Sequence, residues 1–163
     1  MSGFHAFEIV TIRPDLFAFR ELPYTAAGWA AIAGGAFFVI FAMARWWFGL
    51  PRLTFAIMIA VGTVCVTLGV WLIGLEYRFS FFRGESAIVI NMNWFGRPVS
   101  VERLKYSVPP VAEIVTTKRT TNQLVLRFAD GRVKRLGLST DRSGHAEMAG
   151  LINTFLQGGS ILQ

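Results

Sequence analysis

RWWFGLPR, residues 45–52, separates two runs of sequence that contain no Asp, Glu, Lys or Arg. These uncharged runs cover residues 22–44 and 53–75, and each is 23 residues long. Because a helix rises about 1.5 Å per residue and the hydrocarbon core of a bilayer is about 30 Å thick, about 20 apolar residues span it. The two runs therefore predict two transmembrane helices, at about residues 25–44 and 53–75.

The short segment between the runs has the composition of a turn at a membrane surface. Arg45 and Arg52 close the two runs, while Gly49 and Pro51 permit a reversal and prevent either helix from continuing. The segment also holds aromatic rings, which favour the headgroup layer. The residues that we assign to the membrane interface are Trp46, Trp47 and Phe48. We therefore predict a transmembrane helical hairpin over residues 25–75, the alternative being two buried core helices of a soluble protein.

The composition of the whole chain agrees with a membrane location. The 163 residues are 53% hydrophobic and 16% charged, whereas soluble domains carry about 25% charged residues. Arginines near the outer ends of the two predicted spans outnumber those in the turn by four to two, and the positive-inside rule then places both termini in the cytoplasm. The four arginines are Arg13, Arg20, Arg78 and Arg83.

Residues 1–24 precede the first span and are rich in aromatic residues. In FEIVTIRPDLFAFREL, Pro14 and Asp15 suit the first turn of a helix, and apolar residues follow them. We predict a short helix that lies in the membrane interface. It would pack against lipid or against a neighbouring subunit.

Small residues recur along both predicted spans at a spacing of four, which lets helices approach closely. The residues that we assign to helix packing are Ala27, Ala31, Gly35, Ala56 and Ala60. Either the two spans pack on each other, or the small-residue face of the first span docks onto another protein. Neither span contains a His or a charged residue, so we expect no ligated cofactor and no proton relay within them.

Residues 76–163 change to the alternating pattern of strands, interrupted by turn sequences. Asp130 and Gly131 in ADGR predict a type I′ hairpin turn. The run STDRS offers N-cap residues for a helix over about 142–157. The apolar face of that helix would carry Met148, Leu151, Ile152 and Phe155. The pattern predicts a small α+β domain in which a C-terminal helix caps a curved antiparallel sheet of about six strands.

The order of the strands, the hairpin ADGRVKRLGLS and the closing helix AEMAGLINTFL resemble the bacterial pleckstrin-homology-like (PH-like) domains. Such a domain often follows a transmembrane hairpin directly, and membrane-bound assembly factors of photosynthetic complexes are among the members. The resemblance covers about half of the chain and rests on architecture. It implies a PH-like domain over residues 76–163 and a location in the bacterial inner (cytoplasmic) membrane. Relatives that bind phosphoinositides carry a Lys/Arg cluster between their first two strands, whereas RGES here supplies only Arg83.

The sequence offers little catalytic chemistry. His5 and His145 have no neighbouring cysteine or carboxylate pair in sequence, so no metal site is predicted. Neither a nucleophile elbow nor a phosphate-binding loop is present. We expect His145 to lie on the surface, and we expect no enzymatic activity.

Basic residues gather on two predicted hairpins that should be adjacent. They are Lys118, Arg119, Arg127, Arg132, Lys134 and Arg135. Together they would form a positive face that binds anionic headgroups or an acidic partner, or they are simply a solvated face. No aromatic residue interleaves with them, so nucleic-acid binding is not expected. By contrast, Phe79, Phe81 and Phe82 cannot all point inward on one strand. One of these rings should meet lipid, the N-terminal segment or another protein.

These expectations favour a non-catalytic accessory or assembly subunit of a larger integral membrane protein complex, which docks through its hairpin and N-terminal segment. The alternative is a membrane-anchored PH-like module that binds anionic lipid headgroups through its basic face. The expected partners are the lipid bilayer and integral membrane subunits, and a homo-oligomer is a further option. No cofactor is expected.

Overall fold

The structure, a computed structural model, describes residues 7–49, 51–117, 121–137 and 142–159. The chain forms two compact units, each built from segments that are separated in the sequence. The hairpin unit consists of Pro23–Leu75 and Trp94–Gly96. The β-domain consists of Met1–Leu22, Glu76–Asn93 and Arg97–Gln163.

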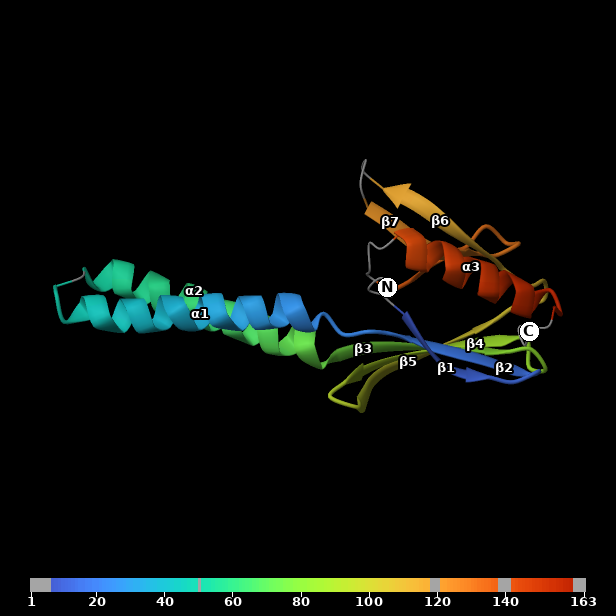
Figure 1. The fold of residues 1–163 in the computed structure, drawn as a ribbon, viewed down its shortest axis with the longest axis horizontal. Helices are drawn as coiled ribbons and strands as arrows, with labels where there is room; N and C mark the ends of the chain where they lie inside the picture. Colours follow the sequence, from blue (N-terminus) through green and yellow to red (C-terminus); the bar gives the residue numbers. More distant parts are fainter. Residues whose placement is uncertain (1–6, 50, 118–120, 138–141, 160–163) are drawn as a thin grey trace. The chain divides into compact units, whose positions relative to one another are not determined.

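The hairpin unit contains two antiparallel helices, α1 (Thr25–Trp46) and α2 (Arg52–Gly74), which lie side by side (Figure 1). Both are long and apolar enough to cross a membrane. The reversal uses Gly49, whose φ of 84° suits a residue without a Cβ. The structure confirms the two predicted helices to within two residues at each end.

The predicted N-terminal helix is wrong, because residues 7–21 form two strands. These are β1 (Phe7–Ile12) and β2 (Leu16–Glu21). Between them, the backbone N–H of Arg13 donates to the carbonyl of Leu16 at 2.8 Å, which closes a turn around Pro14. Phe17 and Phe19 explain the preference: two positions apart, they share one side of a strand but would point to nearly opposite sides of a helix. Both side chains are fully buried.

The described residues of the β-domain form two antiparallel sheets and one helix (Figure 1). The five-stranded sheet has the order β1-β2-β3-β4-β5. Its later strands are β3 (Leu75–Phe82), β4 (Ala87–Trp94) and β5 (Arg97–Lys105). The three-stranded sheet has the order β6-β7-β8, with β6 (Val111–Thr117), β7 (Thr121–Arg127) and β8 (Val133–Leu136). The final helix is α3 (Arg142–Leu156).

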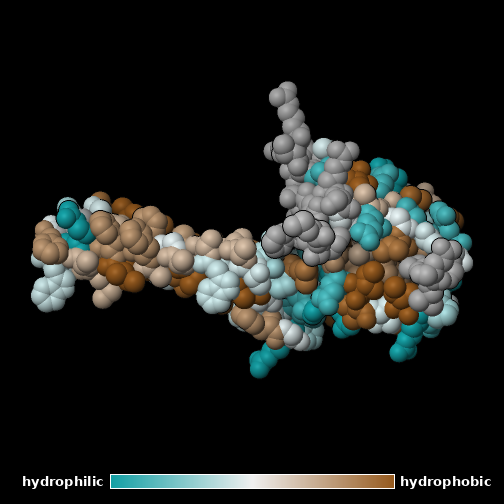
Figure 2. Space-filling view, in the orientation of Figure 1, coloured by the Kyte–Doolittle hydropathy of each residue, from teal (hydrophilic) through white to brown (hydrophobic). Residues whose placement is uncertain are grey.

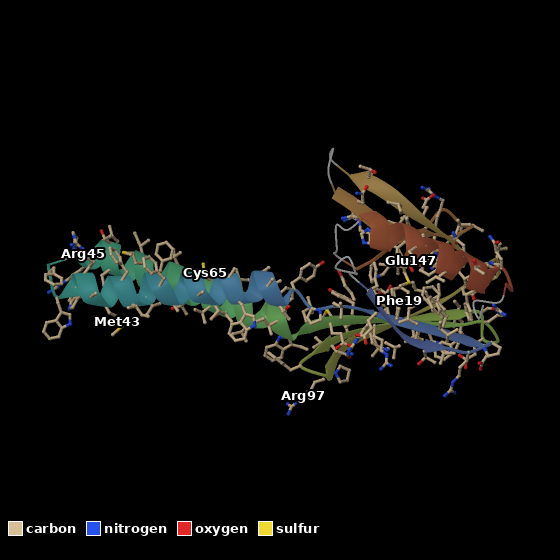
Figure 3. All side chains as sticks on the ribbon, in the orientation of Figure 1. Phe19, Met43, Arg45, Cys65, Arg97 and Glu147 are labelled. Atoms are coloured by element: carbon tan, nitrogen blue, oxygen red, sulfur yellow. The ribbon has the colours of Figure 1, made fainter. Side chains whose placement is uncertain are left out.

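In the sequence, the helical hairpin lies between β2 and β3, and these two strands are neighbours in the larger sheet. Antiparallel pairing of β2 with β3 places Phe17 opposite Phe81 and Phe19 opposite Phe79. The rings of Phe19 and Phe79 stack with centroids 5.0 Å apart. Phe79 and Phe81 are thus buried by the N-terminal segment, one of the three environments anticipated for them. Figure 3 shows Phe19 inside the β-domain.

Helix α3 completes the core of the β-domain. Met148, Ile152 and Phe155 are buried and Leu151 is partly buried, as the apolar stripe predicted. The side chain of Asn153 joins α3 to β6: its Oδ1 accepts from the backbone N–H of Ala112 at 2.8 Å, and its Nδ2 donates to the carbonyl of the same residue at 2.9 Å.

Two smaller expectations are wrong. His145 is fully buried, with its ring centroid 5.3 Å from that of Phe7, because the first turn of α3 packs onto β1. The turn at Asp130 and Gly131 is not type I′, which needs positive φ at both residues. Of these two residues, Gly131 has a positive φ (85°) and Asp130 does not. The N–H of Phe128 donates to the carbonyl of Arg132 at 2.9 Å. The loop is therefore one residue longer than the two-residue loop of a type I′ hairpin.

Candidate functional site

A seam of glycines holds α1 and α2 together. A Cβ added to Gly35 would lie 2.5 Å from the carbonyl oxygen of Gly62, and one added to Gly62 would lie 2.7 Å from that of Gly35. Gly28 and Gly69 repeat the arrangement, with corresponding distances of 2.8 and 2.6 Å. All four glycines are buried. The two backbones are therefore in direct contact, as small residues allow in helix pairs.

The seam follows a spacing of seven residues. Gly28, Gly35 and Ala42 are the buried residues of α1, and Gly62 and Gly69 repeat the interval on α2. A repeat of seven keeps one face of a helix turned toward its neighbour over several turns, whereas a spacing of four drifts around the helix.

Of the five residues assigned to helix packing, the structure brings Gly35 into this seam. Ala27, Ala56 and Ala60 are exposed, and Ala31 is half-buried. Sequence reasoning missed Gly28 as a packing residue. The signal that identifies it is the interval of seven to Gly35, which the nearby alanines at intervals of four obscure.

A second small-residue surface lies on the opposite side of α1. We call it the outer face of α1, and its residues are Ala26, Ala30, Ala33 and Gly34. All four are exposed, and a Cβ added to Gly34 would meet no atom of the described residues within 4 Å. One turn further on, the rings of Phe37 and Phe41 stack with centroids 5.9 Å apart and are 64% and 44% exposed. A shallow surface thus borders a protruding aromatic pair.

Most of the remaining hairpin surface is apolar and exposed, as the brown and tan surface in Figure 2 shows. At the turn, the three residues assigned to the membrane interface are exposed: Trp46 (45%), Trp47 (88%) and Phe48 (80%). The ring of Trp46 also packs on that of Phe55, with centroids 4.8 Å apart. Figure 3 shows Arg45 at this end of the hairpin.

The basic residues do not form one uninterrupted positive face. Lys118 and Arg119 lie outside the described residues. Arg127 contacts the carboxylate of Glu113 at 2.5 Å, and Lys134 forms an ion pair with Glu102. Lys134 and Arg135 are adjacent on β8, so their side chains leave opposite sides of the strand.

The two remaining basic residues differ in their partners. The Nε of Arg132 lies 2.6 Å from the carboxylate of Asp130. The backbone N–H of Arg132 also donates to that carboxylate at 3.0 Å, and these contacts hold the pKa of Asp130 below its usual value. Arg135 has no acidic partner among the described residues.

A groove of about 530 Å³ opens between the two sheets of the β-domain. Its lining includes the apolar residues Phe79, Ile90 and Met92 and the ion pair of Glu102 with Lys134. Arg135 also lines it. This volume is within the range of small-molecule sites, and the mixture of apolar and charged groups suits an amphipathic molecule better than a fully ionic one.

The described residues contain no group of three or more His, Cys, Asp or Glu side chains that could hold a metal ion. Two surfaces of the structure are candidate contact sites: the outer face of α1 and the groove of the β-domain. No family model matches the chain, and no curated protein matches it either.

Proposed function

We propose that this chain is a non-catalytic accessory or assembly subunit of a larger integral membrane protein complex, anchored in the bacterial inner membrane by α1 and α2 with both termini in the cytoplasm. The observation that carries the proposal is that the hairpin completes its own packing on one side of α1 and leaves the outer face of α1 open.

The exposed surfaces of α1 and α2 support the proposal that these helices anchor the chain in a membrane. Only 17% and 11% of their most apolar windows are buried within the chain, whereas a core helix of a soluble protein is covered on most sides. The large apolar residues of both helices need another covering, and lipid supplies it. The four arginines at the outer ends of the spans, against two in the turn, favour cytoplasmic termini.

The outer face of α1 supports the proposal that the hairpin docks onto another integral membrane subunit. Lipid tails are as apolar as leucine, so helices in a bilayer associate through close packing, for which small residues are suited. An anchor that needed only lipid contact would be served equally well by large apolar residues on this face. Gly34 leaves room for a partner helix to approach the backbone, and Phe37 and Phe41 would bury their rings beside it.

The N-terminal segment is not part of the proposed docking surface. Its aromatic residues Phe7, Phe17 and Phe19 are buried in the β-domain, so they are not available to another subunit. Docking is therefore assigned to the hairpin.

The alternative, a module that binds anionic headgroups, has weaker support. Four residues of the predicted positive face are described by the structure, and three of them are already paired with carboxylates: Arg127, Arg132 and Lys134. An anionic lipid would have to compete with those pairs. Arg135 remains available, and a single arginine supplies about 1 kcal/mol of attraction to an anionic membrane surface.

The test is gentle detergent extraction of the native membrane, purification through a tag on Gln163, and mass spectrometry of the proteins recovered. The wild-type chain should bring a stoichiometric set of integral membrane subunits. Replacing Ala30 and Gly34 by Leu should reduce their recovery about tenfold or more, which corresponds to about 1.4 kcal/mol, while the chain stays inserted.

The matched control replaces Ala56 and Ala60 by Leu, at two exposed sites of α2 that are also four residues apart. It should keep the partner subunits, and equal loss in both proteins would exclude the outer face of α1 as the docking surface. A charge reversal of Arg132, Lys134 and Arg135 tests the alternative. If that reversal alone releases the chain's partner or lipid, the headgroup-binding function replaces the one proposed.

A further inference from the structure

The turn between β4 and β5 is attached to the last residue of α2. The backbone N–H of Phe95 donates to the carbonyl of Gly74 at 2.8 Å. A Cβ added to Gly74 would lie 2.6 Å from the ring of Phe95 and 2.7 Å from the Nε1 of Trp94. Both rings thus rest against the backbone at the end of the helix. This contact explains why Trp94–Gly96 belongs to the hairpin unit.

The backbone of this turn is strained at an aromatic residue. Phe95 and Gly96 have φ values of 47° and 75°, the pair of positive values that a two-residue type I′ turn requires. Asn-Gly is the usual choice there, and a bulky residue in the left-handed region costs about 1–2 kcal/mol. A phenylalanine kept at such a position points to a use for its ring.

The two rings are only partly covered. Trp94 and Phe95 contact each other edge to face, with centroids 5.1 Å apart, yet they remain 40% and 58% exposed. Arg97, two residues after Phe95, is exposed and has no acidic partner among the described residues. Figure 3 shows its side chain at this turn.

We propose that the Trp94–Phe95–Gly96 turn is a membrane contact of its own, which inserts its two rings into the phospholipid headgroup layer and places Arg97 among lipid phosphates. The inference rests on the proposed function in one respect: α1 and α2 must cross the bilayer. Gly74 then marks the depth at which α2 leaves the hydrocarbon core.

Lipid is the occupant that this position favours. Trp and other amphipathic aromatic rings concentrate at the headgroup layer, and arginine suits the phosphates beside it. Trp71, one turn earlier on α2, is 45% exposed and adds a third ring near the same end. A turn hydrogen-bonded to the helix end cannot leave this level of the bilayer without breaking its contact with Gly74.

The test uses the full chain reconstituted in vesicles of phosphatidylglycerol and phosphatidylcholine. One protein keeps Trp94 as its sole tryptophan, and a second keeps Trp47, which lies at the opposite end of the hairpin. A third carries Val101→Trp as its sole tryptophan, since Val101 is exposed on β5. Quenching of each by brominated lipids and by aqueous iodide is then measured.

We expect Trp94 to be quenched by the brominated lipids about as strongly as Trp47, to shift its emission to the blue and to lose iodide quenching on reconstitution. The tryptophan at position 101 should keep its iodide quenching. If Trp47 is quenched by lipid and Trp94 is not, the inserted turn is excluded while the anchored hairpin stands. If neither is quenched, the membrane-spanning hairpin itself is wrong.

Lipid quenching at position 101 equal to that of Trp94 would also overturn the inference, because proximity to the bilayer would not be specific to the turn. Because removal of four or five tryptophans can impair folding, a dye-labelled protein that keeps all of them tests the same point. It carries Cys65→Ala and Phe95→Cys with an environment-sensitive dye on the new thiol. Its matched control carries Cys65→Ala and Val101→Cys, and the dye should be protected from iodide by lipid at position 95 alone.

Discussion

Gly35 and Gly62 face each other across the hairpin so closely that neither position has room for a Cβ, since the added atom would lie 2.5 Å or 2.7 Å from the opposite carbonyl oxygen. Gly34, the preceding residue, faces away, and a Cβ there would meet no atom of the described residues within 4 Å. Two adjacent glycines therefore serve different sides of one helix, and identical substitutions should have different consequences.

Gly35→Leu should separate α1 from α2. The obstacle is backbone rather than a flexible side chain, so the helices must move apart, and overpacking of this kind costs about 1–3 kcal/mol. We expect a lower midpoint of thermal unfolding in detergent micelles, measured by circular dichroism. Gly34→Leu is the matched control and should leave the midpoint almost unchanged while it reduces recovery of partner subunits. Equal destabilisation by both changes would contradict the glycine seam.

Phe19→Ala should destabilise the β-domain. The ring is fully buried and stacks on that of Phe79, and loss of a buried Phe typically costs about 3–5 kcal/mol. Two measurements check this: denaturant unfolding in micelles, and hydrogen exchange of the backbone amides in the strands. Val10→Ala is the control, because that strand residue is 38% exposed. If the N-terminal segment were an independent interfacial element, Phe19→Ala would leave exchange in β3 and β4 unaltered.

The sequence alone could not predict the long-range strand pairing of the N-terminal segment, residues 7–21. Pro14 and Asp15 suit a helix start as well as a turn, and the local pattern does not distinguish them. The deciding interaction is the pairing of Phe17 and Phe19 with Phe81 and Phe79, across more than 50 intervening residues that include the whole hairpin. The three phenylalanines of β3 cannot all point inward on one strand, so the sequence predicted a contact for one of them, but it left the N-terminal segment as one of three alternatives.

The hairpin itself was predictable because its signals are local. Two uncharged runs, a turn with Gly49 and Pro51, and arginines at both ends describe it without reference to the rest of the chain. The side of each helix that forms the contact was less clear, since alanines at intervals of four compete with glycines at intervals of seven. Only the close backbone approach at Gly28 and Gly35 decides between them.

Partners of the basic residues likewise depend on tertiary structure. Glu102 and Lys134 are 32 residues apart in sequence and come from strands of different sheets. A count of charges therefore predicted a positive face, whereas the fold pairs most of the described members with carboxylates.

Asp130→Asn should alter the pH dependence of stability in the β7–β8 hairpin. The backbone N–H of Arg132 and the guanidinium of the same residue lower the pKa of Asp130 from 3.8. A carboxyl with a depressed folded-state pKa contributes stability above its unfolded pKa and loses it as the pH falls through the folded value. The wild-type chain should therefore exceed the variant in unfolding midpoint at neutral pH, and the gap should close as the pH falls below 3.8 and through the lowered pKa of Asp130. A gap that persists in acid would assign the effect to hydrogen bonding by the neutral side chain.

Gly74→Ala should displace the aromatic turn from the end of α2. The added methyl would lie 2.6 Å from the ring of Phe95 and 2.7 Å from Trp94, so at least one ring must move. In the protein whose sole tryptophan is Trp94, we expect a change in emission maximum and greater quenching by iodide, because the ring loses its support on the helix backbone.

The control for this last change is Gly84→Ala, at an exposed glycine where a Cβ would meet no atom of the described residues within 4 Å. Its emission should match that of the parent protein. The hydrogen bond from Phe95 to the carbonyl of Gly74 involves backbone atoms only, so it can survive while the rings shift. An unchanged spectrum in Gly74→Ala would mean that Trp94 does not rest on the helix end, and the turn would then have no fixed depth relative to α2.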